Sequence, residues 1–143
     1  MDQHKLESVQ RHATKLVPTL KDKSYTDQLL ALDLPSLLYR HRRGDLIFLF
    51  KLLKGHFRLD YSSFFKISHN IQTRGHSLKF LKPTAHCLCR VNYFSTRVIN
   101  DWNDLPSNAV ETSSINIFKS LLDNYFCDIK FLFHSYFLFF IML

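Results

Sequence analysis

The stretch VNYFSTRVINDWNDLPSNAVETSSINIFKSLLDNYF, residues 91–126, decides the fold because it contains the clearest helical pattern of the chain. Apolar side chains recur there at i, i+4, i+8 and i+11, which places them on one side of a helix: Phe94, Val98, Trp102 and Leu105. Pro106 ends that helix, because proline has no backbone N–H and restricts the residue before it. A second apolar period follows the hydroxyl cluster 112–114, whose side chains can cap a helix. The two predicted helices form a hairpin whose apolar faces must be buried.

The composition favours a helical protein of single-domain size. The chain has 143 residues, among them 14 Phe but only 3 Gly and 4 Pro, a balance that argues against disorder. Its 3 cysteines, an odd number, give no framework of secreted disulfides. The polar amino terminus has no apolar core of a signal peptide. We therefore expect an intracellular protein, nuclear or cytoplasmic, with reduced thiols.

Further helices are predicted ahead of this hairpin. The first has a break or kink at Pro18 and a stripe of apolar side chains expected to be buried: Leu6, Val9, Ala13, Leu16, Val17 and Leu20. Ser24 is the candidate N-cap of a short helix, and Ser36 that of a longer one over about residues 37–53. Gly55 suits the left-handed residue after its end, whereas Gly44 inside it indicates close packing or a kink.

The segment from residue 57 to 92 loses the helical period. Short apolar and polar alternation at 77–80 and 86–91, around a turn at Pro83, predicts a β-hairpin. The expected fold class is therefore mainly α: a small helical bundle over residues 1–126, with a short β-hairpin or an irregular insertion around residues 57–92.

Residues 127–143 form a divergent, Phe-rich hydrophobic tail in this scheme. The last 13 residues carry no formal charge. As a helix they would span about 20 Å, less than a hydrocarbon core of about 30 Å. We therefore do not expect a helix that crosses a membrane. We expect a buried or adhesive terminal segment instead.

Positive charge is concentrated in the first ninety residues. Up to Arg90 there are 16 Lys and Arg against 7 Asp and Glu, whereas 3 stand against 5 from Val91 onward. Because local charge governs attraction to phosphate, RNA or DNA is the expected partner of this part of the chain. Four cations of the longest predicted helix share a sector of about 80°, which could follow a phosphate backbone, although Ile47 lies in the same sector and an ordinary solvated face is the alternative. The candidate nucleic-acid-binding residues are Arg40, Arg43, Lys51, Lys54, Arg74, Lys79 and Lys82.

Aromatic residues between 57 and 65 are interleaved with Arg58 and Lys66. Surfaces that stack on nucleobases use this composition, since every base has a π-face and every nucleotide a charge. Anchoring of a loop to the core is the alternative use of these rings: Phe57, Tyr61, Phe64 and Phe65.

The sequence contains none of the catalytic or cofactor-binding motifs that would identify an enzyme. It lacks the phosphate-binding, dinucleotide-binding, nucleophile-elbow and H-E-x-x-H patterns. Cys87 and Cys89 follow His86 without a second ligand pair, so the spacing does not match a zinc site. Asp101 and Asp104 lie one helical turn apart, which a charged helix end explains. We expect no catalytic residue, no metal, no cofactor and no small-molecule substrate.

Three blocks, taken in order, resemble one family. They are LESVQRHATKLVPTLKDKSYTDQLLALDLPSLLYRHRRGDLIFLFKLLKG, TRGHSLKFLKP and YFSTRVINDWNDLPSNAVETSSINIFKSLLD. Their order and spacing, over about residues 5 to 125, are similar to the carboxy-terminal region of jockey-like non-LTR retrotransposon reverse transcriptases, downstream of the polymerase palm.

The resemblance implies a helical, thumb-like part of a much larger polyprotein that also contains an endonuclease and a polymerase. The metal-binding aspartates of the polymerase have no matching positions, so no catalytic role is carried over. What the resemblance implies is a non-catalytic fragment that holds template and primer or supports the enzyme, whereas the tail from Cys127 departs from the family pattern. The alternative is a small helical adaptor whose hydrophobic tail docks on a partner or a membrane surface.

Overall fold

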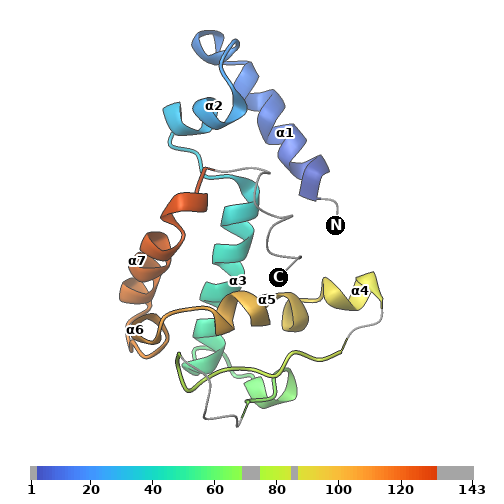
Figure 1. Cartoon of the computed structure of the whole chain (residues 1–143), viewed down its shortest axis with the longest axis vertical. Helices are drawn as coiled ribbons and strands as arrows, with labels where there is room; N and C mark the ends of the chain where they lie inside the picture. Colours follow the sequence, from blue (N-terminus) through green and yellow to red (C-terminus); the bar gives the residue numbers. More distant parts are fainter. Residues whose placement is uncertain (1–2, 69–74, 85–86, 132–143) are drawn as a thin grey trace. The chain divides into compact units, whose positions relative to one another are not determined.

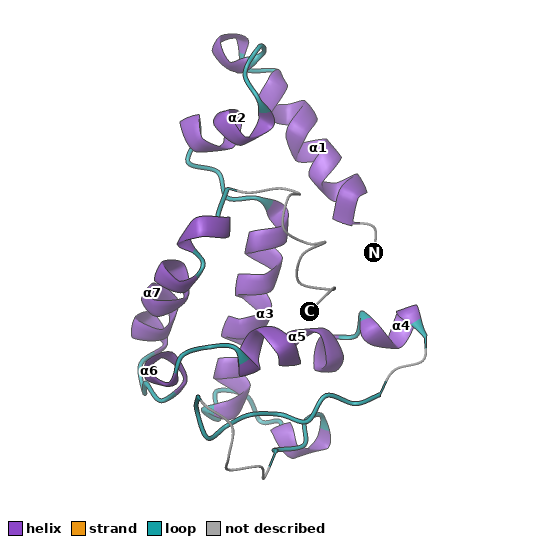
Figure 2. Ribbon diagram, viewed as in Figure 1, coloured by secondary structure: helices purple, strands orange, loops and turns teal. Residues whose placement is uncertain are grey.

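The computed structural model describes residues 3–68, 75–84 and 87–131, and it is mainly helical, as predicted (Figures 1 and 2). Its α-helices are α1 (Gln3–Lys15), α2 (Tyr25–Ala31), α3 (Leu37–Leu53), α4 (Leu88–Val91), α5 (Phe94–Asn103), α6 (Ser107–Val110) and α7 (Ile115–Tyr125). Short 3-10 turns are η1 (Pro18–Leu20), η2 (Tyr61–Ser63) and η3 (Cys127–Ile129).

The chain divides into two compact units. Unit 1 combines residues 1–41 with 126–143, and unit 2 comprises residues 42–125. Residues 126–131 thus belong to the same unit as the amino-terminal helices. The predicted tail lies outside the described residues from 132 onward.

The core of unit 2 forms around the hairpin that the opening stretch predicts. Trp102 is 0% exposed, and its ring lies 6.2 Å from that of Phe118 on α7. Phe118 in turn stacks on Phe50 of α3, with ring centroids 4.1 Å apart. The apolar periods of the three helices thus meet in one core, whose other buried members include Leu46, Leu49, Val98, Ile99, Leu105, Ala109, Val110 and Leu122.

The ends of the predicted helices follow from local chemistry. The hydroxyl of Ser24 accepts from the backbone N–H of Asp27, and that of Ser36 accepts from Tyr39, so both predicted N-caps are confirmed. Gly55 has a φ of +73°, the left-handed conformation expected after the end of α3. Pro106 begins the extra turn α6 instead of a plain loop.

Of the two expectations for Gly44, close packing was wrong. A Cβ atom at this position would meet nothing within 4 Å, and the residue is exposed. Gly44 therefore serves neither close packing nor a left-handed turn.

The predicted hairpin between residues 77–80 and 86–91 was also wrong. Phe80 pairs instead with Ile67 in an isolated antiparallel bridge, and Leu88–Val91 is the helix α4. A short alternation of apolar and polar residues does not identify the pairing partner, and here that partner, Ile67, lies thirteen positions before Phe80. The described residues between α3 and α4 accordingly form the irregular insertion that the sequence left open, and apart from the turn η2 they are drawn as loop in Figure 2.

In unit 1, the predicted burial of the apolar stripe of α1 was wrong, because this helix turns a polar face inward. Glu7 is 1% exposed and Thr14 2%, whereas Leu6, Val9 and Leu16 are 45%, 67% and 83% exposed. Of the predicted stripe only Leu20, in η1, is buried.

Hydrogen bonds explain why α1 lies this way. The carboxylate of Glu7 accepts from the Tyr25 hydroxyl at 2.6 Å and from the backbone N–H of Leu37 at 3.0 Å. That N–H is one of the four at the start of α3 that lack an intrahelical partner. Thr14 donates to the Gln28 side chain at 2.7 Å. Burial and the Glu7 hydrogen bond both raise the pKa of Tyr25, which keeps its donor proton.

Candidate nucleic-acid interface

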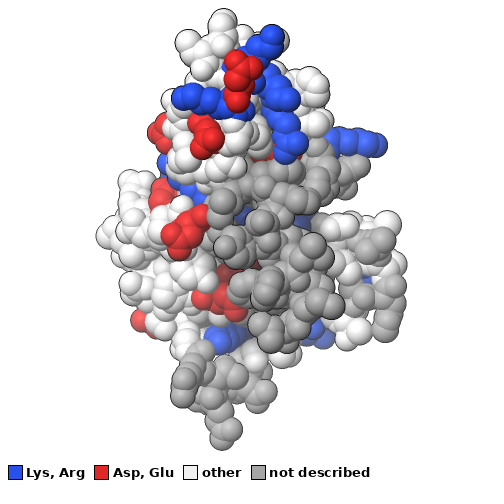
Figure 3. Space-filling view, turned by 45° about the horizontal axis from the view of Figure 1, so that its top comes forward, with Lys and Arg blue, Asp and Glu red and all other residues white. Residues whose placement is uncertain are grey.

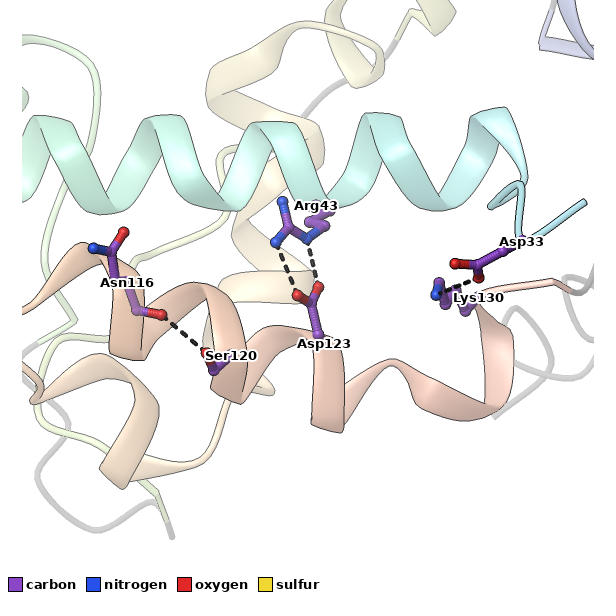
Figure 4. Close-up of polar contacts among 6 residues, drawn as sticks. All are labelled: Asp33, Arg43, Asn116, Ser120, Asp123 and Lys130. Carbon is purple, nitrogen blue, oxygen red and sulfur yellow. Dashed lines mark hydrogen bonds and ion pairs between the residues drawn. The ribbon is translucent and has the colours of Figure 1, made fainter.

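Some of the arginines of α3 form ion pairs with Asp side chains of other helices. Arg43 binds both oxygens of Asp123 on α7, at 2.5 and 2.9 Å (Figure 4). Arg42 binds Asp101 on α5 in the same two-pronged way, and Arg97 of α5 binds Asp45 of α3. These Arg–Asp pairs join the helices of unit 2, a role that Arg fulfils better than Lys because its donors form a rigid fork.

These contacts reduce the number of accessible cations among the four that were predicted to share one side of α3. Arg43 has two donors engaged by Asp123, and Arg40, in unit 1, donates to the side chain of Gln10 at 2.8 Å. Lys51 is half-buried and Lys54 is exposed, with its ammonium 5.3 Å from the centroid of the Phe50 ring. The two lysines at the end of α3 are thus its most accessible predicted cations.

The net positive charge lies in one segment of unit 2. Residues 51–90, the basic segment, contain eight Lys and Arg against one Asp, a net charge of +7 that equals the formal charge of the whole chain. Its single carboxylate, Asp60, accepts from the backbone N–H of Ser62 at 2.9 Å and from the hydroxyl of the same residue. These two bonds lower the pKa of Asp60.

The end of α5 fixes the middle of the basic segment. The indole N–H of Trp102 donates to the carbonyl of Leu78 at 2.8 Å, and Asn103 binds both the N–H and the carbonyl of Phe80. Phe80 is buried and pairs with Ile67. The backbone of residues 78–80 is therefore held on both sides.

This anchoring determines which side chains face outward. Side chains alternate along paired strands, so the neighbours of the inward-facing Ile67 and Phe80 point away from the core. Lys66 and Leu81 are exposed and Lys79 is half-buried. Other exposed cations of the basic segment are Arg58, Lys82 and Arg90, whereas Arg74 lies outside the described residues.

The aromatic residues of this segment separate into core and surface. Phe65 is 3% exposed and packs 5.0 Å from Phe80, which makes it an anchor. Phe57 lies 5.0 Å from the ring of Phe48 and is half-buried. Phe64, 54% exposed, is the ring best placed for stacking on a base.

The candidate phosphate-binding residues taken from the sequence did not include Arg90, and Arg58 and Lys66 entered the prediction only as part of the possible base-stacking surface. A count of acids as well as bases by segment would have found them, because residues 51–90 are nearly free of carboxylates. Unit 1 differs: blue and red side chains lie close together around α1 and α2, at the top of Figure 3. The sequence could not show that Arg43 binds Asp123, because the two residues lie eighty positions apart.

Other kinds of site find no support in the described part of the chain. No group of three His, Cys, Asp or Glu side chains there could hold a metal ion. None of its helices is long and apolar enough to span a membrane. Cys87, Cys89 and Cys127 are free and exposed thiols. Asp101 is occupied by Arg42, and the backbone carbonyl of Asp104 accepts from Tyr125 at 3.2 Å.

Comparisons with known proteins identify no family. No protein-family model matches the chain, and no match was found among curated proteins or among solved structures.

Proposed function

We propose that this chain is a non-catalytic, nucleic-acid-associated fragment of the reverse transcriptase of a jockey-like non-LTR retrotransposon. The observation that carries the nucleic-acid role is the basic segment, which has a net charge of +7 and whose backbone Trp102 and Asn103 hold at Leu78 and Phe80. The resemblance of the three sequence blocks carries the family. The ligand is RNA or DNA, bound through the phosphate backbone.

Exposed lysines on a fixed backbone bind phosphates without reading the sequence. Such binding is weak at physiological salt, with dissociation constants of about 10⁻⁴ to 10⁻⁶ M. It weakens further as the salt concentration rises, because the release of counterions from the nucleic acid then becomes less favourable. Phe64 adds stacking on an unpaired base, so a single strand should bind more tightly than a duplex.

Fluorescence anisotropy with a labelled single-stranded RNA, and with the matching DNA, tests the proposal over a range of salt concentrations. The test variant combines Lys54→Gln, Lys66→Gln and Lys82→Gln, all exposed residues of the basic segment. The control removes the same charge from exposed residues of unit 1: Lys15→Gln, Lys21→Gln and Lys23→Gln.

The test variant should reduce the slope of log K against log salt by about 2, since each lost contact to a single strand is worth about 0.7. The control should retain the wild-type slope. Equal losses in both variants, or binding that does not respond to salt, would exclude the basic segment as the site.

The second candidate function is a helical adaptor, and the exposed apolar side chains of α1 favour it. Deletion of residues 131–143 separates the two functions. A shortened chain that keeps nucleic-acid binding supports the first proposal, whereas loss of a bound protein or membrane fraction supports the adaptor.

A further inference from the structure

The part of α3 that lies in unit 2 carries an exposed aromatic ring at Phe48. This side chain is 41% exposed, although Leu46 and Leu49 on either side of it in the sequence are buried. Two half-buried rings pack against it. The ring of Phe57 lies 5.0 Å away with the planes 32° apart, and that of Phe94 lies 5.1 Å away and nearly perpendicular. The Phe48 ring is therefore held in place by its neighbours and is still accessible to a ligand.

Gly44 leaves open space one helical turn before Phe48. It is exposed, and a Cβ atom at this position would meet nothing within 4 Å. Glycine weakens the interior of a helix relative to alanine, and neither packing nor a positive φ requires it here. Helical side chains lean toward the amino end of the helix, so the Phe48 ring extends in the direction of this bare backbone. A flat ligand therefore has room beside the ring.

A cation lies on the same side of α3. Lys51 follows Phe48 by three positions and is half-buried. At 100° per residue Gly44, Phe48 and Lys51 fall within about 60° of the helix circumference. The Cβ atoms of residues i and i+3 are about 5–6 Å apart, a separation that the base and the phosphate of one nucleotide can bridge.

The nearest acid of this helix is already paired. Asp45 lies three positions before Phe48, and its two carboxylate oxygens accept from Arg97 of α5 at 2.7 and 2.9 Å. The same guanidinium lies 6.0 Å from the centroid of the Phe94 ring. Because its charge is matched, Asp45 does not exclude an anionic ligand from the Phe48 ring.

A planar ligand with a negative charge fits these features best. Every nucleobase has a π-face that stacks on aromatic side chains, and every nucleotide carries a phosphate. An aliphatic side chain of a partner protein would fill the same space without using Lys51. We infer that Phe48 stacks on an unpaired base of a single-stranded nucleic acid, beside Gly44, and that Lys51 binds the phosphate of the same nucleotide. This inference rests on the proposed function and adds a stacking residue that lies outside the basic segment.

Fluorescence anisotropy with two labelled DNA strands of equal length tests the stacking: a normal single strand, and an abasic strand with the same phosphates. Phe48→Leu keeps an apolar side chain and removes the π-face, and circular dichroism verifies its fold. It should weaken binding of the normal strand at least about fivefold, and that of the abasic strand less than about twofold. The slope of log K against log salt should not change, since no charge is lost. Phe48→Tyr retains the ring and should bind like the wild type.

Gly44→Leu blocks the site and leaves the ring in place. The added side chain enters open space and leucine favours a helix, so thermal unfolding should occur at a temperature no lower than that of the wild type. Binding of the normal strand should nevertheless weaken at least about fivefold, because the base loses its place. Asn116→Leu adds the same side chain at an exposed position of α7 and should leave the affinity unchanged.

The outcomes separate this inference from the function on which it rests. Salt-dependent binding that neither Phe48→Leu nor Gly44→Leu weakens would overturn the stacking site and leave the basic segment as the binding surface. Equal losses for the normal and the abasic strand would also overturn it, because the base would then contribute nothing. A wild-type chain that binds neither strand would overturn both proposals. Self-association of the wild type in sedimentation, abolished by Phe48→Leu, would assign this face to a second copy of the chain instead.

Discussion

Trp102 combines three tasks in one side chain. Its ring lies in the core against Phe118 and stands nearly perpendicular to the His76 ring, with centroids 5.9 Å apart, and its N–H donates to the carbonyl of Leu78. Position in the helical period predicts the burial of this ring. The hydrogen bond to Leu78 could not be predicted, since nothing in the sequence indicates which loop carbonyl lies within reach.

Replacement of Trp102 should therefore be the most damaging change in the core. Trp102→Ala is expected to lower the free energy of unfolding by about 3 to 5 kcal/mol, a large part of the stability of a small domain. Trp102→Phe retains most of the apolar volume and should cost less. Urea unfolding followed by circular dichroism measures both, and an alanine variant as stable as the wild type would contradict the central position of this ring.

His76 is a buried histidine that gives the fold a dependence on acidity. It is 4% exposed, its Nε2 donates to the carbonyl of Trp102 at 3.0 Å, and Nδ1 has no hydrogen-bond partner in the described part of the chain. Burial lowers the pKa of this imidazole, and the charge of Lys79 acts in the same direction against the Trp102 hydrogen bond. The neutral ring is thus the folded form.

The sign of the pH effect follows from the lowered pKa. The unfolded chain takes up a proton at this histidine near pH 6.5, before the folded chain does. Stability should therefore be complete above about pH 6.5, fall as the pH decreases below it, and level off below the folded pKa. Urea unfolding of His76→Gln should show a smaller loss between pH 7.5 and 5, with His12→Gln, at an exposed position, as control. A steeper loss in His76→Gln would refute the assignment.

At the scale of elements, sequence periodicity located the long helices but not every face. The apolar periods of α3 and α5 end before Gly55 and Pro106, and that of α7 begins after the hydroxyl cluster 112–114. For α1 the period placed the wrong side inward. Polar contacts accompany this orientation, because the inward Glu7 accepts from the Tyr25 hydroxyl and from the part-buried N–H of Leu37 at the start of α3, contacts that an apolar period does not predict.

The orientation of α1 gives a direct prediction at this scale. Glu7→Ala removes the acceptor for both Tyr25 and Leu37, and should destabilise the protein by about 1 to 3 kcal/mol. Lys15→Ala, on the exposed side of the same helix, should change stability by less than about 0.5 kcal/mol. Thermal unfolding of the two variants compares them, and similar small effects would mean that α1 lies with its other face inward.

At the scale of the whole molecule, the proposed function depends on the separation of charge into paired and unmatched groups. The sequence predicts a polyanion partner for the first ninety residues, and the proposal narrows this surface to the basic segment. Arg42, Arg43 and Arg97 are committed to Asp101, Asp123 and Asp45, whereas the basic segment has almost no acid to match its cations. Only contacts between distant residues reveal this distinction.

Lysine footprinting tests the proposed binding of nucleic acid to the basic segment most directly. Acetylation of exposed lysines, with and without a saturating single-stranded RNA at low salt, is quantified residue by residue by mass spectrometry. The account predicts protection of Lys54, Lys66 and Lys82, all in the basic segment, and no protection of Lys15, Lys21 and Lys23 in unit 1. Uniform protection of all six lysines, or protection limited to unit 1, would contradict it.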